Sequence, residues 1–242
     1  MPRFYCPAPL TAGASVDLPA AVAHHLHVVR LQPGAPLTLF DGTGGQYRAS
    51  LLELSKKHAT AHIDAFEAVE AEAPYAVTLA QGLPEGSKMD WIVEKAVELG
   101  AVAIQPLAAQ RSVVRLSGER AEKRQSHWQG VIVSASEQCG RNRLVQLHAL
   151  AETRSWLGQP AGAGQRILLS PRADASLAEW ARTTPQREVT LLVGPEGGFS
   201  PEEEQAALAA GALALSMGPR VLRTETAGLA ALALLAGAWG GL

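Results

Sequence analysis

The stretch LLVGPEGGFSPEEE (residues 191–204) predicts a buried strand, a glycine-rich turn and the start of a helix. Ser200 fits the N-cap, Pro201 fits the first helical position, and Glu203 completes a capping box. Many α/β proteins bind a phosphate where a glycine-rich turn meets a helix N-terminus. Here Glu202–Glu204 place three carboxylates at that terminus and complement the helix dipole, so we do not expect a phosphate there.

The chain also lacks the usual nucleotide-binding motifs. It contains neither a Walker A P-loop nor a G-x-G-x-x-G fingerprint after a strand, so ATP, GTP and NAD are poor ligands for this turn. Gly194, Gly197 and Gly198 favour close approach of the backbone to a flat, uncharged group. S-adenosylmethionine meets these conditions, because it carries an adenine and a sulfonium cation but no phosphate. The alternative, that the glycines serve only the geometry of the turn, stays open.

Strands and helices alternate from residue 76 onward, which predicts an α/β domain with a mostly parallel sheet. We expect strands at 76–81, 101–107, 166–170, 189–194 and 212–217. We expect helices from a cap at Ser87 to Gly100, at 119–138, from Pro201, and from about Thr226. Ligands of such sheets bind beyond the carboxyl ends of the strands, so the loops 170–174, 194–200 and 218–226 are the candidate site.

Residues 1–72 have a different pattern and predict a separate, mainly β domain. Short apolar runs flank the glycine-rich turn Gly42–Gly45, which is typical of a β-hairpin. A short helix is expected at 19–31 and a further strand at 56–69. Residues 67–75 are the expected linker, and residues 73–242 form the second domain.

The charge of the chain is unevenly distributed. Its 242 residues carry a formal net charge of −2, and 47% of them are hydrophobic, enough for a sizeable core. Residues 105–145, however, hold seven basic and three acidic residues, and arginine suits forked contacts with phosphate. A solvated helix face would give the same pattern. We nevertheless take the following arginines as candidate RNA contacts: Arg3, Arg30, Arg111, Arg115, Arg141 and Arg143.

The sequence gives no indication of a membrane span, a leader peptide or a metal site. No run of about 18 uncharged apolar residues occurs, and the N-terminal stretch is unlike a signal peptide. Cys6 and Cys139 are too far apart in the sequence to suggest a metal or redox motif, and a cytoplasmic protein is the expectation. His24 and His27 could share a helix face, but no further ligand completes a site, so we expect no metal.

LLVGPEGGFSPEEE, followed by SMGPRVLRTETAGLAAL (216–232), resembles the SPOUT class of RNA methyltransferases. More narrowly it resembles the RsmE family, the small-subunit ribosomal RNA uridine N3-methyltransferases. The resemblance continues through GSKMDWIVEKAVELGAVAIQPL (86–107) and SASEQCGR (134–141), and it covers nearly the whole chain.

The resemblance implies more than the residues themselves do. It implies a C-terminal α/β domain with a deep trefoil knot, an N-terminal PUA-like β-barrel that helps to hold RNA, and a homodimer. The cofactor would be S-adenosylmethionine, and the substrate would be one uridine of 16S rRNA in the small ribosomal subunit. By position, the cofactor site would consist of Ser170, Pro171, Gly194, Pro195, Glu196, Gly197, Gly198, Met217, Gly218, Leu222, Arg223, Thr224 and Thr226.

Methylation of uridine N3 requires that the N3 proton leaves, and negative charge then develops on N3 and the flanking carbonyl oxygens. Our hypothesis is that Arg223 stabilises this charge and that Glu225 or Glu196 accepts the proton. The alternative is that Glu225 caps its helix and pairs with Arg223.

Two other functions remain possible at this point. One is a SPOUT-type ribose 2′-O-methyltransferase acting on rRNA or tRNA. The other is an RNA-binding ribosome-assembly factor without catalysis, although such a factor would not need the cofactor loops.

Overall fold

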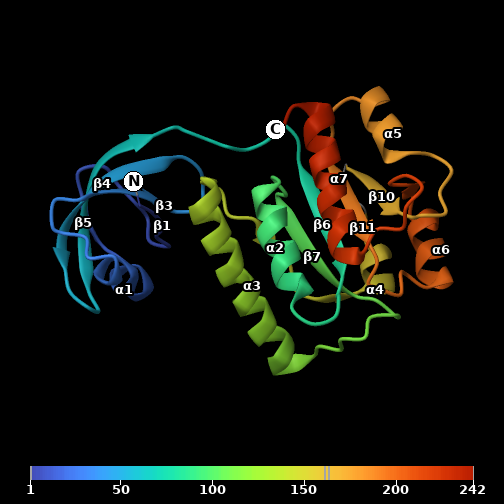
Figure 1. The fold of residues 1–242 in the computed structure, drawn as a ribbon, viewed down its shortest axis with the longest axis horizontal. Coiled ribbons are helices and arrows are strands. Elements are labelled where there is room, and N and C mark those ends of the chain that lie inside the picture. Colours follow the sequence, from blue (N-terminus) through green and yellow to red (C-terminus); the bar gives the residue numbers. More distant parts are fainter. Residues whose placement is uncertain (1, 161, 163, 242) are drawn as a thin grey trace. The chain divides into compact units, whose positions relative to one another are not determined.

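A computed structural model describes residues 2–160, 162 and 164–241 (Figure 1). The chain divides into two compact units. The first consists of Met1–Glu72 together with Ser136–Leu144, and the second of Ala73–Ala135 together with Val145–Leu242. The segment Ser136–Leu144 is distant in sequence from the rest of its unit. A single linear boundary after residue 72 therefore does not describe the division.

The first unit is built on a mixed sheet with the strand order β1-β3-β4-β5-β2. Its elements are β1 (Arg3–Tyr5), β2 (Ser15–Asp17), α1 (Ala20–Val28), β3 (Pro36–Phe40), β4 (Gln46–Leu54) and β5 (Ala59–Glu67). β1 runs parallel to β3, whereas the other neighbours are antiparallel. The predicted hairpin at Gly42–Gly45 joins β3 to β4. Gly44 and Gly45 both have positive φ angles, which explains why glycines occupy this turn.

One face of this sheet and the helix α1 enclose the core of the first unit. Burial alternates along β5, where Ala59, Ala61 and Ile63 are buried and their neighbours are not. Leu26 of α1 belongs to the same buried cluster. The predicted helix at 19–31 is thus confirmed as α1, which packs on the sheet through one apolar side.

The second unit contains a parallel sheet with the order β12-β10-β11-β6-β7-β8, and β9 also pairs with β7. Every recorded pair of neighbours is parallel. The strands are β6 (Val77–Gly82), β7 (Ala103–Ala108), β8 (Gln146–Leu147), β9 (Ala151–Glu152), β10 (Gln165–Leu169), β11 (Val189–Val193) and β12 (Leu213–Leu215). This sheet confirms the α/β class that the alternation of elements predicts.

Helices cover both faces of the parallel sheet. The helices that follow β6 along the chain are α2 (Lys88–Glu98), α3 (Gly118–Cys139), α4 (Thr153–Leu157), α5 (Leu177–Thr183), α6 (Pro201–Ala209) and α7 (Thr224–Trp239), and the residues of α3 from Ser136 onward belong to the first unit. α2 and α7 lie side by side, and α4 contacts α6 (Figure 1). Leu79 of β6 approaches Gly228 of α7, while the next residue, Ala80, belongs to a core cluster with Leu157 of α4 and Ala207 of α6. Because successive strand residues point to opposite faces, α7 lies on one face and the α4/α6 pair on the other.

Two details differ from the sequence-based expectations. α7 begins at Thr224, two residues before the predicted start. Ser87 occupies the N-cap position of α2, but its side chain makes no capping hydrogen bond. Asp90 accepts a hydrogen bond from Trp128 Nε1 at 2.9 Å, so it joins α2 to α3. In the part of the chain that the structure describes, no helix combines the length and the apolar character needed to cross a membrane.

Candidate active site

The three loops selected from the sequence line a single cavity of about 490 Å³ in the second unit. They follow β10, β11 and β12, whose carboxyl ends lie at the same edge of the sheet. The predicted residues that line it are Ser170, Pro171, Gly194, Pro195, Glu196, Gly197, Gly198, Met217, Gly218, Leu222, Arg223, Thr224 and Glu225. Thr226 is not among the lining residues. It lies in the first turn of α7, where its backbone N–H donates to the carbonyl of Arg223.

The glycine loop after β11 is a tight turn closed on itself. The Gly198 N–H donates to the carbonyl of Pro195 at 2.8 Å, and Gly198 has a φ of 68°. A Cβ atom on Gly194 would lie 2.8 Å from the backbone nitrogen of Phe199, closer than real Cβ atoms approach. The turn itself therefore requires glycine at 194 and favours it at 198. The alternative that these glycines serve turn geometry explains their presence without excluding a ligand.

The helix that follows this loop has the predicted cap. The Ser200 hydroxyl accepts from the Glu203 N–H, and Glu203 Oε2 accepts from the Ser200 N–H at 2.8 Å. Glu203 is only 1% exposed, and its other oxygen accepts from the Gln110 N–H at 2.8 Å. Glu204 pairs with Arg172. Glu203 and Glu204 thus have partners within the protein, and the negative charge at this helix N-terminus disfavours a phosphate there.

Glu196, in the middle of the glycine loop, is held by Lys88, the first residue of α2, and by Glu85 in the loop before that helix. Its Oε1 accepts a hydrogen bond from Lys88 Nζ at 2.6 Å and another from the Glu85 N–H at 3.0 Å. Burial alone would raise the pKa of the Glu196 carboxyl, but these hydrogen bonds outweigh it, and the pKa is lowered. The same hydrogen bond raises the pKa of Lys88. Glu196 is therefore a carboxylate that resists protonation.

Thr224 connects the third loop to the second. Its hydroxyl donates to the carbonyl of Gly194 at 2.6 Å and accepts from Gln81 Nε2 at 2.9 Å. Gln81 is fully buried at the end of β6. This chain of hydrogen bonds fixes the start of α7 against the glycine loop, so the walls of the cavity are formed together.

Glu225 differs from the other carboxylates of the cavity. Its Oε2 is buried and has no hydrogen-bond partner within the described residues. The N-cap of α7 is Arg223, which makes no side-chain capping bond, and across the described chain no ion pair joins Arg223 to Glu225. The geometry thus does not favour the alternative in which these two residues only cap the helix and pair with each other.

Comparison with known proteins assigns the chain to a family. Residues 71–236 match the family model described as "RNA methyltransferase domain", and residues 18–64 match the one described as "RNA methyltransferase PUA domain". The chain is 35% identical to the ribosomal RNA small subunit methyltransferase E of Synechocystis over 227 residues, covering 91% of this chain and 72% of that protein. The chain belongs to the ribosomal RNA small subunit methyltransferase E family.

Solved structures support this assignment. The chain superposes on ribosomal RNA small subunit methyltransferase E from Neisseria gonorrhoeae, bound to S-adenosyl methionine, with a TM-score of 0.91 and 38% identity over 99% of this chain and 98% of the other. It also matches the putative methyltransferase Lpg2936 from Legionella pneumophila, in complex with the cofactor SAM, with a TM-score of 0.92 and 33% identity over 98% of both chains. The first unit is accordingly a PUA-like mixed sheet, and the second is the methyltransferase domain.

Two of the arginines predicted to contact RNA in this rRNA methyltransferase lie at or near the cavity. Arg111 is exposed and lines the cavity, and it donates to the carbonyls of Gly197 (3.1 Å) and Phe199 (3.3 Å). Arg115 is exposed and donates to the carbonyl of Gln110 at 2.7 Å. Both side chains reinforce the loops around the cavity while they remain accessible to solvent.

The other four arginines belong to the PUA-like unit and differ in accessibility. Arg141 is 3% exposed, and its Nε donates to Glu72 at 3.0 Å, so burial argues against the predicted phosphate contact. Arg3 donates to Gln46 Oε1 at 2.8 Å and to Asn142. Arg143 and Arg30 are exposed. Since phosphate contacts need an accessible guanidinium, Arg30 and Arg143 are the better candidates in this unit.

Three further cations, which were not among the predicted site residues, line the cavity of this family member: Lys88, Arg172 and Arg220. Arg172 and Arg220 lie inside the two outer candidate loops, so charge within those loops could have identified them. Lys88 precedes the glycine loop by more than 100 residues, since its hydrogen bond to Glu196 spans 108 positions. No sequence pattern connects these two residues.

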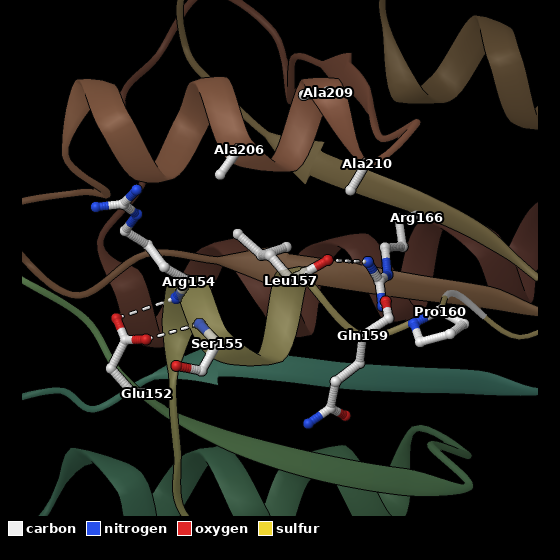
Figure 2. Close-up of a pocket in the computed structure, with 11 residues that line it drawn as sticks. Glu152, Arg154, Ser155, Leu157, Gln159, Pro160, Arg166, Ala206, Ala209 and Ala210 are labelled. Carbon is white, nitrogen blue, oxygen red and sulfur yellow. Dashed lines mark hydrogen bonds between the residues drawn. The ribbon is translucent and has the colours of Figure 1, made fainter.

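A larger cavity, of about 960 Å³, lies between α4 and α6 of the methyltransferase domain (Figure 2). Ala206, Ala209 and Ala210 line it from α6 and its C-cap, and Leu157 lines it from α4. Arg166 donates to the carbonyl of Leu157 at 3.1 Å, and Glu152 accepts from the backbone of Ser155 at 2.7 Å. The polar groups here serve the ends of α4, and none of the three loops reaches this cavity. Size alone therefore does not identify the active site.

Proposed function

We propose that this protein transfers a methyl group from S-adenosylmethionine to N3 of a specific uridine in 16S rRNA of the small ribosomal subunit. The observation that carries the proposal is the cavity at the carboxyl ends of β10, β11 and β12. It combines the three predicted loops with the N-terminal turn of α6, where three carboxylates disfavour a phosphate. The two solved relatives described as bound to this cofactor support the same choice.

The cavity fits S-adenosylmethionine by size and by charge. Its volume of about 490 Å³ lies in the range of small-molecule sites. Glu196 and Glu225 supply negative charge beside a cofactor that carries a sulfonium cation. The glycine loop presents backbone groups that can recognise adenine without any charge. When bound, the cofactor supplies an electrophilic methyl group.

The residues of the chain then have to remove the N3 proton and stabilise the charge left behind. Glu225 is our choice for the proton acceptor, because its buried Oε2 has no partner within the described part of the chain and is free to accept a hydrogen bond. Glu196 is less suited to accept the proton, because its Oε1 already accepts two hydrogen bonds and these lower its pKa. Arg223, exposed at the cavity and without an acidic partner in the described chain, would stabilise the negative charge on the uracil carbonyl oxygens.

The cations at the cavity suit the RNA rather than the cofactor. S-adenosylmethionine carries a positive sulfonium, so additional positive charge at the opening of the cavity favours a polyanionic second substrate. Arg111, Arg220 and Arg223 are exposed there. Arg115, Arg143 and Arg30 are further candidates for phosphate contacts, since their side chains are exposed.

Three further features belong to this proposal. The strand order in the methyltransferase domain is compatible with a deep trefoil knot in the segment that carries the three loops. The PUA-like sheet would close into a barrel that holds RNA. The active molecule would be a homodimer in which a second chain completes the site.

The proposal is tested on small subunits from cells that lack the protein. They are incubated with purified protein and methyl-labelled S-adenosylmethionine, and the rRNA is digested to nucleosides for mass spectrometry. Labelled N3-methyluridine is the expected product. A ribose-methylated nucleoside would show that the methylated atom is the ribose 2′-oxygen and not N3. RNA binding without any methyl transfer would indicate a non-catalytic assembly factor.

A further inference from the structure

We propose that Lys88 is a positioning residue that holds the glycine loop Gly194–Gly198 in its binding shape by fastening Glu196. The proposal rests on the proposed function, since it concerns the loop assigned to the cofactor. It gives Lys88 a role that the sequence did not suggest, and it changes the role of Glu196 from a candidate base to an anchor.

Two short hydrogen bonds join Glu196 of the glycine loop to residues 85–88. Lys88 Nζ and the Glu85 N–H both donate to Glu196 Oε1, at 2.6 and 3.0 Å. The side chains of Lys88 and Glu196 are each 32% exposed, so the pair is partly shielded from solvent. Hydrogen bonds between charged groups are the stronger kind, and partial shielding reduces their screening by salt.

A second contact brings the same connection against the loop. A Cβ atom on Gly82, at the end of β6, would lie 2.6 Å from Pro195 Cδ. Gly82 thus lets the backbone of β6 touch Pro195, while Lys88 and Glu85 hold the next residue of the loop. Thr224 fixes the start of the loop, and Arg111 fixes its end through Gly197. Without Lys88, Glu196 would lose the charged partner that keeps the middle of the turn in place.

A role in charge and a role in position predict opposite effects on cofactor binding. If Lys88 acted only by charge, its removal would leave Glu196 unpaired and strengthen the attraction for a sulfonium cation. If Lys88 acts as an anchor, its removal loosens the loop, and binding weakens. Loss of the carboxylate in Glu196→Gln would weaken binding in both cases, so the Lys88 variant decides.

The test measures the Kd of S-adenosylmethionine by calorimetry on the full-length protein and on the variants Lys88→Met, Lys88→Arg, Glu196→Gln and the Lys88→Met/Glu196→Gln double variant. We expect Lys88→Met to raise the Kd about fivefold, near the upper limit for a partly exposed ion pair. Lys88→Arg should bind close to the unaltered protein. The double variant should be no weaker than the weaker single variant, because both remove the same contact.

Lys95→Met is the matched control. Lys95 lies on the same helix and pairs with Glu94 and Glu98 at 2.7 Å, away from the cavity. Its removal should leave the Kd unchanged. Backbone amide exchange without cofactor gives an independent readout, and residues 196–198 should exchange faster in Lys88→Met than in Lys95→Met.

Three results would each contradict the proposed role of Lys88. They are tighter or unchanged binding of S-adenosylmethionine in Lys88→Met, additive losses of affinity in the double variant, and unchanged amide exchange at residues 196–198. If the unaltered protein failed to bind S-adenosylmethionine, the proposed function would fall first and this inference with it. If the unaltered protein bound but Lys88→Met behaved like Lys95→Met, only this inference would fall.

Discussion

Glu196, Glu203 and Glu225 are three carboxylates in and beside one cavity, and each has a different set of partners. Glu203 completes the cap of α6, and Glu196 is fastened by Lys88. Glu225 keeps a buried oxygen without a partner in the described chain. The capping box could be predicted because its members are three residues apart. The roles of Glu196 and Glu225 could not be separated, because Lys88 is more than 100 positions from its partner.

Substitution of Glu225 by Gln tests its proposed role as the base. The amide keeps the size of the side chain but cannot take the proton, so kcat should fall by a factor of about 100 or more. The Kd of S-adenosylmethionine should rise by no more than about fivefold, since the cavity keeps its shape and loses only one of the charges that face the sulfonium. Single-turnover methylation and calorimetry measure the two quantities, and a kcat close to that of the unaltered protein would rule out this base.

Glu137 should make the folded state less stable as the pH rises, which is the opposite of the usual effect of a carboxyl group. Burial raises the pKa of its carboxyl, although the N–H of Tyr5 donates to it and partly opposes the shift. An acid whose pKa is raised in the folded state stabilises it below the unfolded pKa, and this stability is lost as pH rises through the folded pKa. Glu137→Gln should therefore raise the free energy of unfolding at pH 7.5 by up to about 1 kcal/mol and change it little at pH 4. Urea unfolding at both pH values checks this, and a loss of stability confined to pH 7.5 would contradict it.

The helices and strands that could be predicted from the sequence are the longer ones and those with a clear cap or apolar periodicity. The strands β6, β10 and β11 and the helices α3 and α6 were predicted from apolar periodicity and caps. α4 and α5 were missed, because five and seven residues are too few to show a helical period. Ser200 and Ser87 precede their helices in the same way. Only Ser200 makes a capping hydrogen bond, and the sequence does not distinguish them.

These two serines form a matched pair for a stability test. Ser200→Ala removes the hydroxyl that accepts from the Glu203 N–H, and it should lower the free energy of unfolding by about 1 kcal/mol. Ser87→Ala removes no capping bond and should cost no more than about 0.5 kcal/mol. Chemical denaturation measures both, and equal losses would show that the cap does not explain the stability of α6.

Gly194 of the glycine loop and Gly130 of α3 form a second matched pair. In Gly194→Ala the new Cβ would meet the backbone at 2.8 to 2.9 Å, so the turn has to deform. We expect a lower Tm and a Kd for S-adenosylmethionine raised about tenfold or more, since backbone cannot move aside cheaply. Gly130→Ala, in the exposed middle of α3 with no atom within 4 Å, should instead stabilise by about 0.5 to 1 kcal/mol. An unchanged Kd for S-adenosylmethionine in Gly194→Ala would show that the glycine loop does not take part in cofactor binding.

For the molecule considered as a unit, the β and α/β parts were predictable from the change in periodicity near residue 70. The assignment of Ser136–Leu144 to the first unit was not. It depends on Arg141 pairing with Glu72 and on Asn142 donating to Val69, contacts that span about 70 positions. A sequence pattern reports neighbours along the chain, whereas these contacts form only after the fold has brought distant segments together.

The proposed homodimer gives a prediction for the assembly. Analytical ultracentrifugation at micromolar protein should give about twice the chain mass of 25.4 kDa. A monomer at every concentration, with full methyltransferase activity, would show that one chain completes its own site. Such a result would remove the dimer from the proposal and leave the cavity in place.

The most direct test of the central claim is the amount of N3-methyluridine in 16S rRNA of cells that lack the protein, measured by mass spectrometry after complementation. We predict that the nucleoside is absent without the protein and returns with the unaltered gene. It should not return with Glu225→Gln expressed at the same level. N3-methyluridine that persists without the protein, or that Glu225→Gln restores in full, would contradict the assignment of this reaction to this cavity.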